Sequence, residues 1–131
     1  MTRQRNDRHS TEFGLWLRSQ PELDAQLHKL SATNLDFIWR NYATNQWMCI
    51  EEKRFMSALT FSQRQTLNFL KPVFAADPKF CGIHIVTFQK TSPDDGLIFL
   101  DENMEHEFSP LEERLITKEQ LIRLLQFRTI R

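Results

Sequence analysis

The strongest constraint on the fold of this chain is a change in the spacing of its apolar residues between residues 34 and 89. Residues 34–42 and 47–53 are rich in aromatic and β-branched side chains and are separated by four residues, which is typical of two antiparallel strands in a hairpin. Residues 60–74 switch to the spacing of a helix, and residues 82–89 return to the alternation of a strand. This order predicts a sheet that is covered by a helix.

Shorter elements complete the order at both ends of the chain. Residues 11–20 predict a helix that ends before Pro21, and residues 96–100 predict a short strand. Thr117 and Gln120 have the spacing of a capping box at the start of a last helix. We therefore expect the α/β class, as a three-layer sandwich with a mixed central sheet flanked by helices. The buried face of the last helix is expected to carry Leu121, Ile122 and Leu125.

The length and the composition predict one compact domain. The chain has 131 residues, of which 40% are hydrophobic. Residues 1–10 are polar and rich in arginine, so we expect a flexible basic arm followed by a single domain over residues 11–131. No stretch approaches the roughly 18 apolar residues of a membrane span, and the first residues lack the apolar run of a signal peptide. We expect a soluble, cytoplasmic protein without a membrane partner.

The formal net charge is zero, from 17 basic and 17 acidic residues, but the charges are unevenly distributed. Residues 94–114 contain eight acidic residues and one basic residue, which leaves 16 bases and 9 acids in the rest of the chain. This positive excess is enough for a basic face that contacts a phosphate backbone. The alternative is that charges of both signs simply solvate the surface.

Three ionisable residues are placed on the two strands of the predicted hairpin. Asp36 lies in the otherwise apolar first strand, and Glu51 and Lys53 share one face of the second strand because they are two positions apart. Burying such charges is costly unless they pair or hold a metal. Two carboxylates are hard oxygen ligands that suit Mg²⁺ or Mn²⁺. Such a cation can polarise a phosphoryl oxygen, while Lys53 can orient a water or neutralise negative charge.

These residues resemble the core motif of the PD-(D/E)xK nuclease superfamily. Asp36 and the segment Ile50-Glu51-Glu52-Lys53 are similar to the D…(D/E)xK pattern, although Leu35 stands where the name of the family has a proline. Glu12 on the first predicted helix precedes them, and this order resembles that of the small Holliday-junction resolvases.

The following part of the chain resembles a second branch of that superfamily, the VRR-NUC modules. In those modules ExK leads through a short loop to a helix that bears a glutamine, and then to a strand. Residues 50–70, which contain Gln63, and residues 81–88 have this order. The likeness covers roughly residues 11–90, and the acidic segment and the last helix are unmatched.

The resemblance implies a restriction-endonuclease-like fold and a set of site residues. Asp36 and Glu51 would be metal ligands, the backbone carbonyl of Glu52 a further ligand, Lys53 the catalytic lysine, Glu12 an accessory acid and Gln63 the helix glutamine. The arginines that would contact DNA phosphates are Arg3, Arg5, Arg8, Arg54 and Arg64.

Plainer explanations of the residues in the hairpin stay open. Asp36 and Glu51 could form an edge-strand ion pair with Lys53 and hold no metal. A strand shifted by one residue would instead turn Glu52 and Arg54 inward, because successive side chains of a strand point to opposite faces.

The residues outside the hairpin also have plainer explanations. Glu12 could simply complement the dipole of its helix. Gln63 could be an interior amide whose hydrogen bonds are satisfied, and Arg54 and Arg64 could belong to a solvated surface.

Taken together, these patterns predict a Mg²⁺- or Mn²⁺-dependent nuclease that hydrolyses DNA in recombination, repair or restriction. A homodimer would enlarge the surface that grips duplex DNA. The alternative function is a non-catalytic nuclease-fold protein that binds nucleic acid or a protein partner, and cleavage of RNA is a third. Three glycines leave no phosphate-cradling loop, which excludes the P-loop and dinucleotide-binding classes.

Overall fold

The computed structural model describes residues 11–23 and 29–130. The chain divides into two compact units, residues 1–34 and 35–131. The predicted basic arm over residues 1–10 lies outside the described residues, together with its arginines, Arg3, Arg5 and Arg8. The single domain expected over residues 11–131 stays a prediction.

The first unit contains the helix α2 (Glu12–Ser19) and the 3-10 turn η1 (Pro21–Leu23). Thr11 caps α2, since its Oγ1 accepts a hydrogen bond from the Gly14 N–H at 3.0 Å. The helix ends at Gln20, whose backbone is extended, because the residue before a proline disfavours the helical conformation. The helix predicted over residues 11–20 is confirmed.

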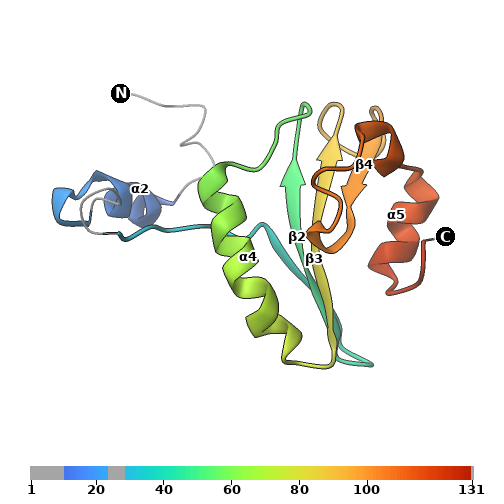
Figure 1. The fold of residues 1–131 in the computed structure, drawn as a ribbon, viewed down its shortest axis with the longest axis horizontal. Helices are drawn as coiled ribbons and strands as arrows, with labels where there is room; N and C mark the ends of the chain where they lie inside the picture. Colours follow the sequence, from blue (N-terminus) through green and yellow to red (C-terminus); the bar gives the residue numbers. More distant parts are fainter. Residues whose placement is uncertain (1–10, 24–28, 131) are drawn as a thin grey trace. The chain divides into compact units, whose positions relative to one another are not determined.

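The second unit is built on a five-stranded mixed sheet, in the order β1-β2-β3-β4-β5 (Figure 1). Strands β2 and β3 are parallel, and every other neighbouring pair is antiparallel. A parallel pair needs a crossover, and the helix α4 (Phe61–Ala75) supplies it. The α/β class with a mixed sheet is thereby confirmed. The strands are β1 (Phe37–Asn41), β2 (Gln46–Lys53), β3 (Phe80–Phe88), β4 (Ile98–Asp101) and β5 (Leu115–Ile116).

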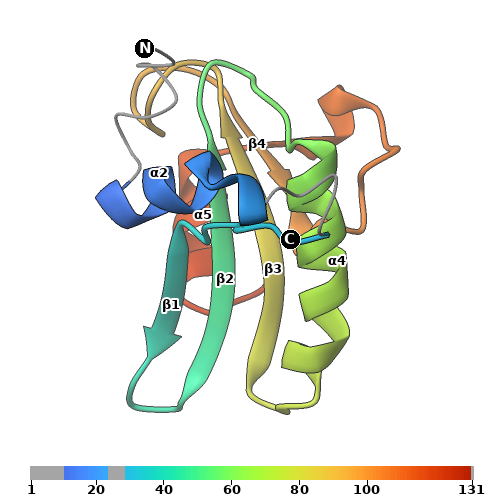
Figure 2. The same cartoon turned by 90° about the vertical axis from the view of Figure 1, so that its left-hand side faces the viewer.

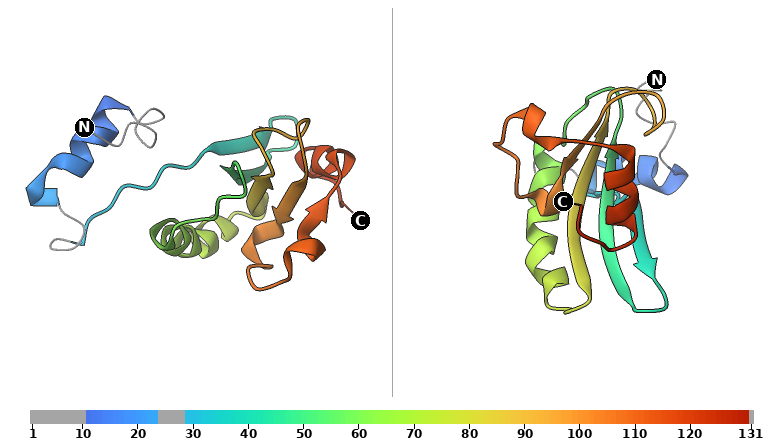
Figure 3. Two further views of the ribbon diagram at one scale, coloured as in Figure 1. Left: turned by 90° about the horizontal axis from the view of Figure 1, so that it is seen from above. Right: turned by 90° about the vertical axis from the view of Figure 1, so that its right-hand side faces the viewer.

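Helices cover both faces of this sheet. Figure 2 and the right-hand view of Figure 3 are taken from opposite sides, and they show α4 and then α5 (Lys118–Leu125) in front of the strands. Leu67 of α4 packs in one buried cluster with Cys49, Ile83 and Ile85. The other cluster joins α5 to the opposite face of β2 and β3. Successive strand residues therefore belong to different layers, as the pleat requires.

The predicted hairpin is confirmed, but one of its residues is displaced. Strands β1 and β2 are antiparallel, with Phe37 opposite Ile50 and Asn41 opposite Gln46. Asp36, which we expected inside the first strand, directly precedes β1. Strand β1 is an edge strand with β2 as its neighbour, and their pairing stops at Phe37 and Ile50, although β2 continues to Lys53.

The last helix is also confirmed, with a different buried face from the one expected. Thr117 and Gln120 form the predicted capping box. Leu121 and Leu124 are buried, whereas Ile122 is 47% exposed. The prediction for Ile122 was wrong because positions i and i+3 of a helix share a face, while position i+1 is turned by about 100°.

Three short elements that were not predicted lie within the acidic residues 94–114 or directly after them. They are β5 and two 3-10 turns, η2 (Glu102–Met104) and η3 (Leu111–Arg114). None of the helices in the described part of the chain combines the length and the apolar character that a bilayer crossing requires.

Gly82 of β3 is expected to be intolerant of a side chain. Its φ of 107° is unfavourable for other residues, and an added Cβ would lie 2.9 Å from Asn103 Oδ1. Gly82→Ala should lower the free energy of unfolding by about 2 kcal/mol in chemical denaturation. Gly14→Ala is the comparison, because its backbone is not left-handed and its Cβ would approach no other side chain more closely than the Arg18 Nη1 at 3.3 Å. Equal losses in the two variants would contradict the explanation.

Candidate functional site

Four of the predicted site residues form one hydrogen-bonded cluster at the end of β2. The backbone N–H of Asp36 donates to Glu51 Oε1 at 3.2 Å. The side-chain amide of Gln63 donates from Nε2 to Glu51 Oε2 at 3.4 Å and accepts at Oε1 from Lys53 Nζ at 2.8 Å. The structure thus brings Asp36, Glu51, Lys53 and Gln63 together, and their predicted roles stay predictions.

The hairpin register places the two carboxylates beside each other. Because Phe37 is opposite Ile50, the preceding Asp36 comes next to Glu51. The backbone N–H of Glu52 donates to Asp36 Oδ2 at 2.8 Å, which holds the Asp36 side chain against β2. Two hydrogen bonds from backbone N–H groups therefore hold the carboxylates of Asp36 and Glu51 side by side near the end of β2.

Burial of the three ionisable side chains is uneven, contrary to the expectation that all would be interior. Glu51 is 3% exposed, Lys53 is half-buried and Asp36 is exposed. The reason is that Asp36 lies outside β1 at the rim of an edge strand, where water reaches it. Glu51 lies one strand further in and is covered by α4.

Gln63 is held in place by the cap of α4. Thr60 Oγ1 accepts from the Gln63 N–H at 3.1 Å, and Gln63 Oε1 accepts from the Thr60 N–H at 3.0 Å. This capping box fixes the amide that bridges Lys53 and Glu51. Gln63 is thus a hydrogen-bonded amide that also contacts the site residues, and this geometry is compatible with both explanations of Gln63. Sequence reasoning missed Thr60, although its spacing to Gln63 is the signal used for the last helix.

Burial and, after it, the negative charge of Asp36 raise the pKa of Glu51 from 4.5 to about 7. The hydrogen bond from the Asp36 N–H and the positive charge of Lys53 offset part of this rise in pKa. Near neutral pH the carboxyl of Glu51 is therefore divided between its two protonation states. A cation that binds there competes with a proton.

The observed register excludes the shifted strand. Glu51 and Lys53 face α4, whereas Glu52 lines an apolar groove on the opposite face together with Ile50. Glu52 Oε2 pairs with Arg54 Nε at 3.4 Å. The pair that faces α4 is therefore Glu51 and Lys53, as predicted for the strand without a shift.

The structure gives other local contacts or positions to Arg64 and Glu12. Arg64 of α4 forms an ion pair from its Nε to Glu107 Oε1 at 2.7 Å. Glu12 lies in the first turn of α2, where it complements the helix dipole, and its role as an accessory acid stays a prediction. The DNA contacts of Arg54 and Arg64 likewise stay predictions.

The donor set of the cluster fits a partly hydrated Mg²⁺. The residues that the structure describes contain no group of three or more His, Cys, Asp and Glu side chains arranged for a metal ion. Mg²⁺ usually keeps several waters and takes one or two carboxylates together with substrate phosphates. A buried carboxylate of raised pKa beside a second carboxylate is a suitable pair, and the backbone of Glu52 lies next to it.

No family model, curated protein or solved structure matches this chain. An assignment of function therefore depends on the geometry and the chemistry of the cluster.

Replacing Glu51 with glutamine should change how stability depends on pH. Since the folded pKa is raised, the contribution of protonated Glu51 is full below pH 4.5 and is lost as the pH rises through about 7. In EDTA, the stability of Glu51→Gln relative to the parent should rise by up to about 3 kcal/mol between about pH 5 and about pH 9. Denaturant unfolding at several pH values measures this. A pH-independent difference would show that the Glu51 carboxyl keeps an ordinary pKa.

Proposed function

We propose that this chain is a divalent-metal-dependent nuclease that hydrolyses phosphodiester bonds of DNA, with the cluster of Asp36, Glu51, Lys53 and Gln63 as its active site. The observation that carries the proposal is the buried Glu51 carboxylate, which has a second carboxylate beside it and a lysine tied to it through one amide. A purely structural ion pair would bring Lys53 directly to the carboxylates. Here Gln63 lies between them.

The proposed fold is the restriction-endonuclease-like sandwich of the PD-(D/E)xK superfamily. It is supported by the hairpin β1–β2, the helix α4 that follows the ExK segment, and the parallel strand β3 beside β2. This order agrees with the one on which the resemblance was based. The proposed partner is DNA, and the homodimer stays a prediction.

The residues of the cluster would divide the work of phosphodiester hydrolysis. Asp36 and Glu51 would hold the cation, with the backbone carbonyl of Glu52 as a further ligand. When bound, a divalent cation supplies the positive charge that polarises a phosphoryl oxygen. Lys53 would orient the attacking water or neutralise the charge that develops on the phosphate. Gln63 would position Lys53, because its Oε1 accepts from Lys53 Nζ while the helix cap holds the amide.

Cleavage assays test this proposal directly. Labelled duplex, nicked, flap, four-way-junction and single-stranded DNA are incubated with the protein in Mg²⁺ or Mn²⁺, with a matching RNA panel. We expect cleavage of DNA that EDTA abolishes and that Lys53→Ala or Asp36→Ala reduces at least about 100-fold. Lys79→Ala is the control, since Lys79 precedes β3 at the end of the sheet opposite to Lys53. Parental rates in folded Lys53→Ala and Asp36→Ala would show that the assignment is wrong.

The second candidate function is a non-catalytic protein of the same fold. It is favoured by the absence, among the described residues, of a group of three or more side chains that could hold a metal ion. Metal binding separates the two candidates. Mn²⁺ should raise the melting temperature of the parent, and the shift should disappear in Asp36→Ala. Because a proton on Glu51 competes with the cation, the shift should grow between about pH 6 and about pH 8. A parent that shows no shift in millimolar Mn²⁺ would favour the non-catalytic binder.

A further inference from the structure

A cavity of about 180 Å³ lies on the α4 side of the sheet, one strand away from the cluster. Its lining includes Ile85 and Thr87 of β3, and these residues are the register partners of Glu51 and Lys53. Partners on neighbouring strands point to the same face and are about 5 Å apart. The cavity has room for several water molecules and therefore for one phosphate group.

Two arginines line this cavity from different elements. Arg64 directly follows Gln63 in the first turns of α4, and Arg114 is the last residue of η3. Arg114 donates from Nη2 to Ser109 O at 3.2 Å, but its Nε is buried and has no hydrogen-bond partner among the described residues. An unpaired buried donor is costly, so an acceptor that enters the cavity would be favourable.

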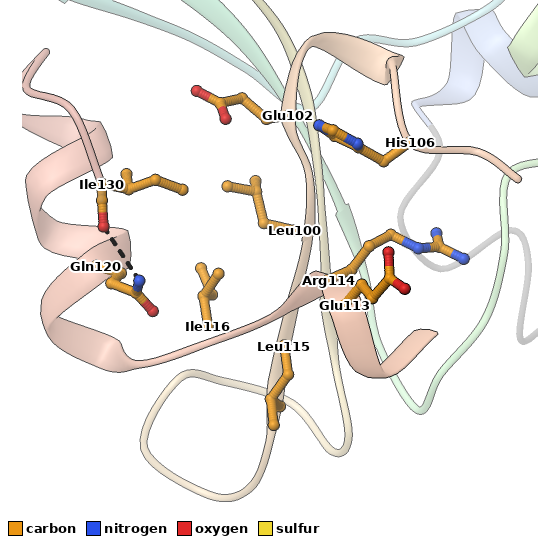
Figure 4. A pocket seen from close by; sticks show the side chains of 9 residues that line it. All are labelled: Leu100, Glu102, His106, Glu113, Arg114, Leu115, Ile116, Gln120 and Ile130. Atoms are coloured by element: carbon orange, nitrogen blue, oxygen red, sulfur yellow. Dashed lines mark hydrogen bonds between the residues drawn. The ribbon is translucent and has the colours of Figure 1, made fainter. Parts of the chain in front are cut away.

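Arg114 also borders a second cavity, of about 120 Å³, which Glu102 and Glu113 line as well (Figure 4). Figure 4 shows its guanidinium directed away from Gln120 and Ile130, the residues that close that cavity at α5 and the chain end. Arg114 thus lines both this cavity and the one that adjoins the cluster.

The charges around the first cavity are balanced in this structure by two carboxylates. Asp101 is buried, and its Oδ1 is occupied by the backbone N–H of His106 at 2.7 Å. Glu107 pairs with Arg64 at 2.7 Å, and the two side chains are 32% and 25% exposed. Carboxylates and phosphates make the same charge-assisted bonds with a guanidinium. Glu107 therefore occupies Arg64 in the way that a phosphate would.

The position of Glu107 allows it to be displaced. It lies between η2 and η3 in a stretch without helix or strand, and the next residue, Phe108, is 94% exposed. Movement of this side chain breaks no element of the fold. Without Glu107, the charged residues that line the cavity would be two arginines and Asp101. Their net charge is positive, which attracts an anion.

We propose that this cavity is a subsite for a backbone phosphate of the DNA strand that the cluster cleaves, with Arg64 and Arg114 as its donors and Glu107 as the group that the phosphate displaces. This inference rests on the proposed nuclease function, because the subsite adjoins Glu51 and Lys53. It also assigns a role to part of the acidic segment. Because Glu107 competes for Arg64, only a strand whose phosphate enters the cavity and displaces Glu107 gains this contact.

The test measures binding of a labelled single-stranded oligonucleotide in EDTA by fluorescence anisotropy, so that no cleavage occurs. Glu107→Gln should tighten binding about tenfold, the size expected of one charged hydrogen bond, and Arg114→Gln should weaken it by a similar factor. Asp94→Asn is the matched control. It removes the same charge from the acidic segment at a side chain that is 75% exposed and paired with Lys118 outside the cavity.

A double substitution separates the subsite from a general effect of charge. In an Arg64→Gln background, Glu107→Gln should give no tightening, because its effect requires the free guanidinium. Circular dichroism confirms that each variant is folded, and Arg114→Lys replaces Arg114→Gln if the latter unfolds. Equal tightening by Glu107→Gln and Asp94→Asn, or an absence of DNA binding by the parent and all variants, would overturn the subsite.

Failure of the subsite and failure of the proposed function give different results. If Lys53→Ala abolishes cleavage but Arg64, Arg114 and Glu107 variants bind DNA like the parent, the nuclease stands and the subsite is wrong. If these variants change binding as expected but the parent cleaves nothing, the subsite stands as a nucleic-acid contact and catalysis is wrong.

Discussion

The buried carboxylate of Glu51 is the group on which the candidate site depends. It accepts one hydrogen bond from the Asp36 main chain and one from the amide of Gln63, so it joins the hairpin to α4. The amide is available only because the capping box with Thr60 holds it. A buried charge that lost either donor would be costly, and this cost ties the hairpin register and the start of α4 to one another.

Burial makes the ionised carboxylate of Glu51 costly when no cation is bound, and a bound cation would offset part of this cost. Desolvation and the charge of Asp36 raise the pKa of Glu51 to about 7, so its ionised form lacks sufficient compensation from the protein alone. Lys53 lowers this pKa but is bonded to Gln63. Beside the adjoining cavity, the charge of Arg64 is balanced by an ion pair with Glu107. Both places therefore hold ionisable groups whose chemistry also suits a metal ion or a phosphate.

Much of the fold could be predicted because the signals that specify it are local. The alternation in β2 and β3, the helical spacing of α4 and the capping box at Thr117 each lie within a few residues of one another. The convergence of Asp36 with the ExK segment could be inferred because a four-residue connection leaves few registers for a hairpin. The exposure of Asp36 could not be inferred, since it depends on where an edge strand ends. The same holds for Ile122 in a helix of eight residues.

The sequence by itself determined the order of the elements, the face that Glu51 and Lys53 share, and the residue types available to a metal or a phosphate. Only the tertiary structure decided that Gln63 separates Lys53 from Glu51 and that Arg64 faces Glu107, 43 positions further along the chain. The physical reason is that periodicity and capping act over a few residues of backbone. Burial, pKa and ion pairing depend on which distant side chains the packing of α4 and the sheet brings within a few ångströms.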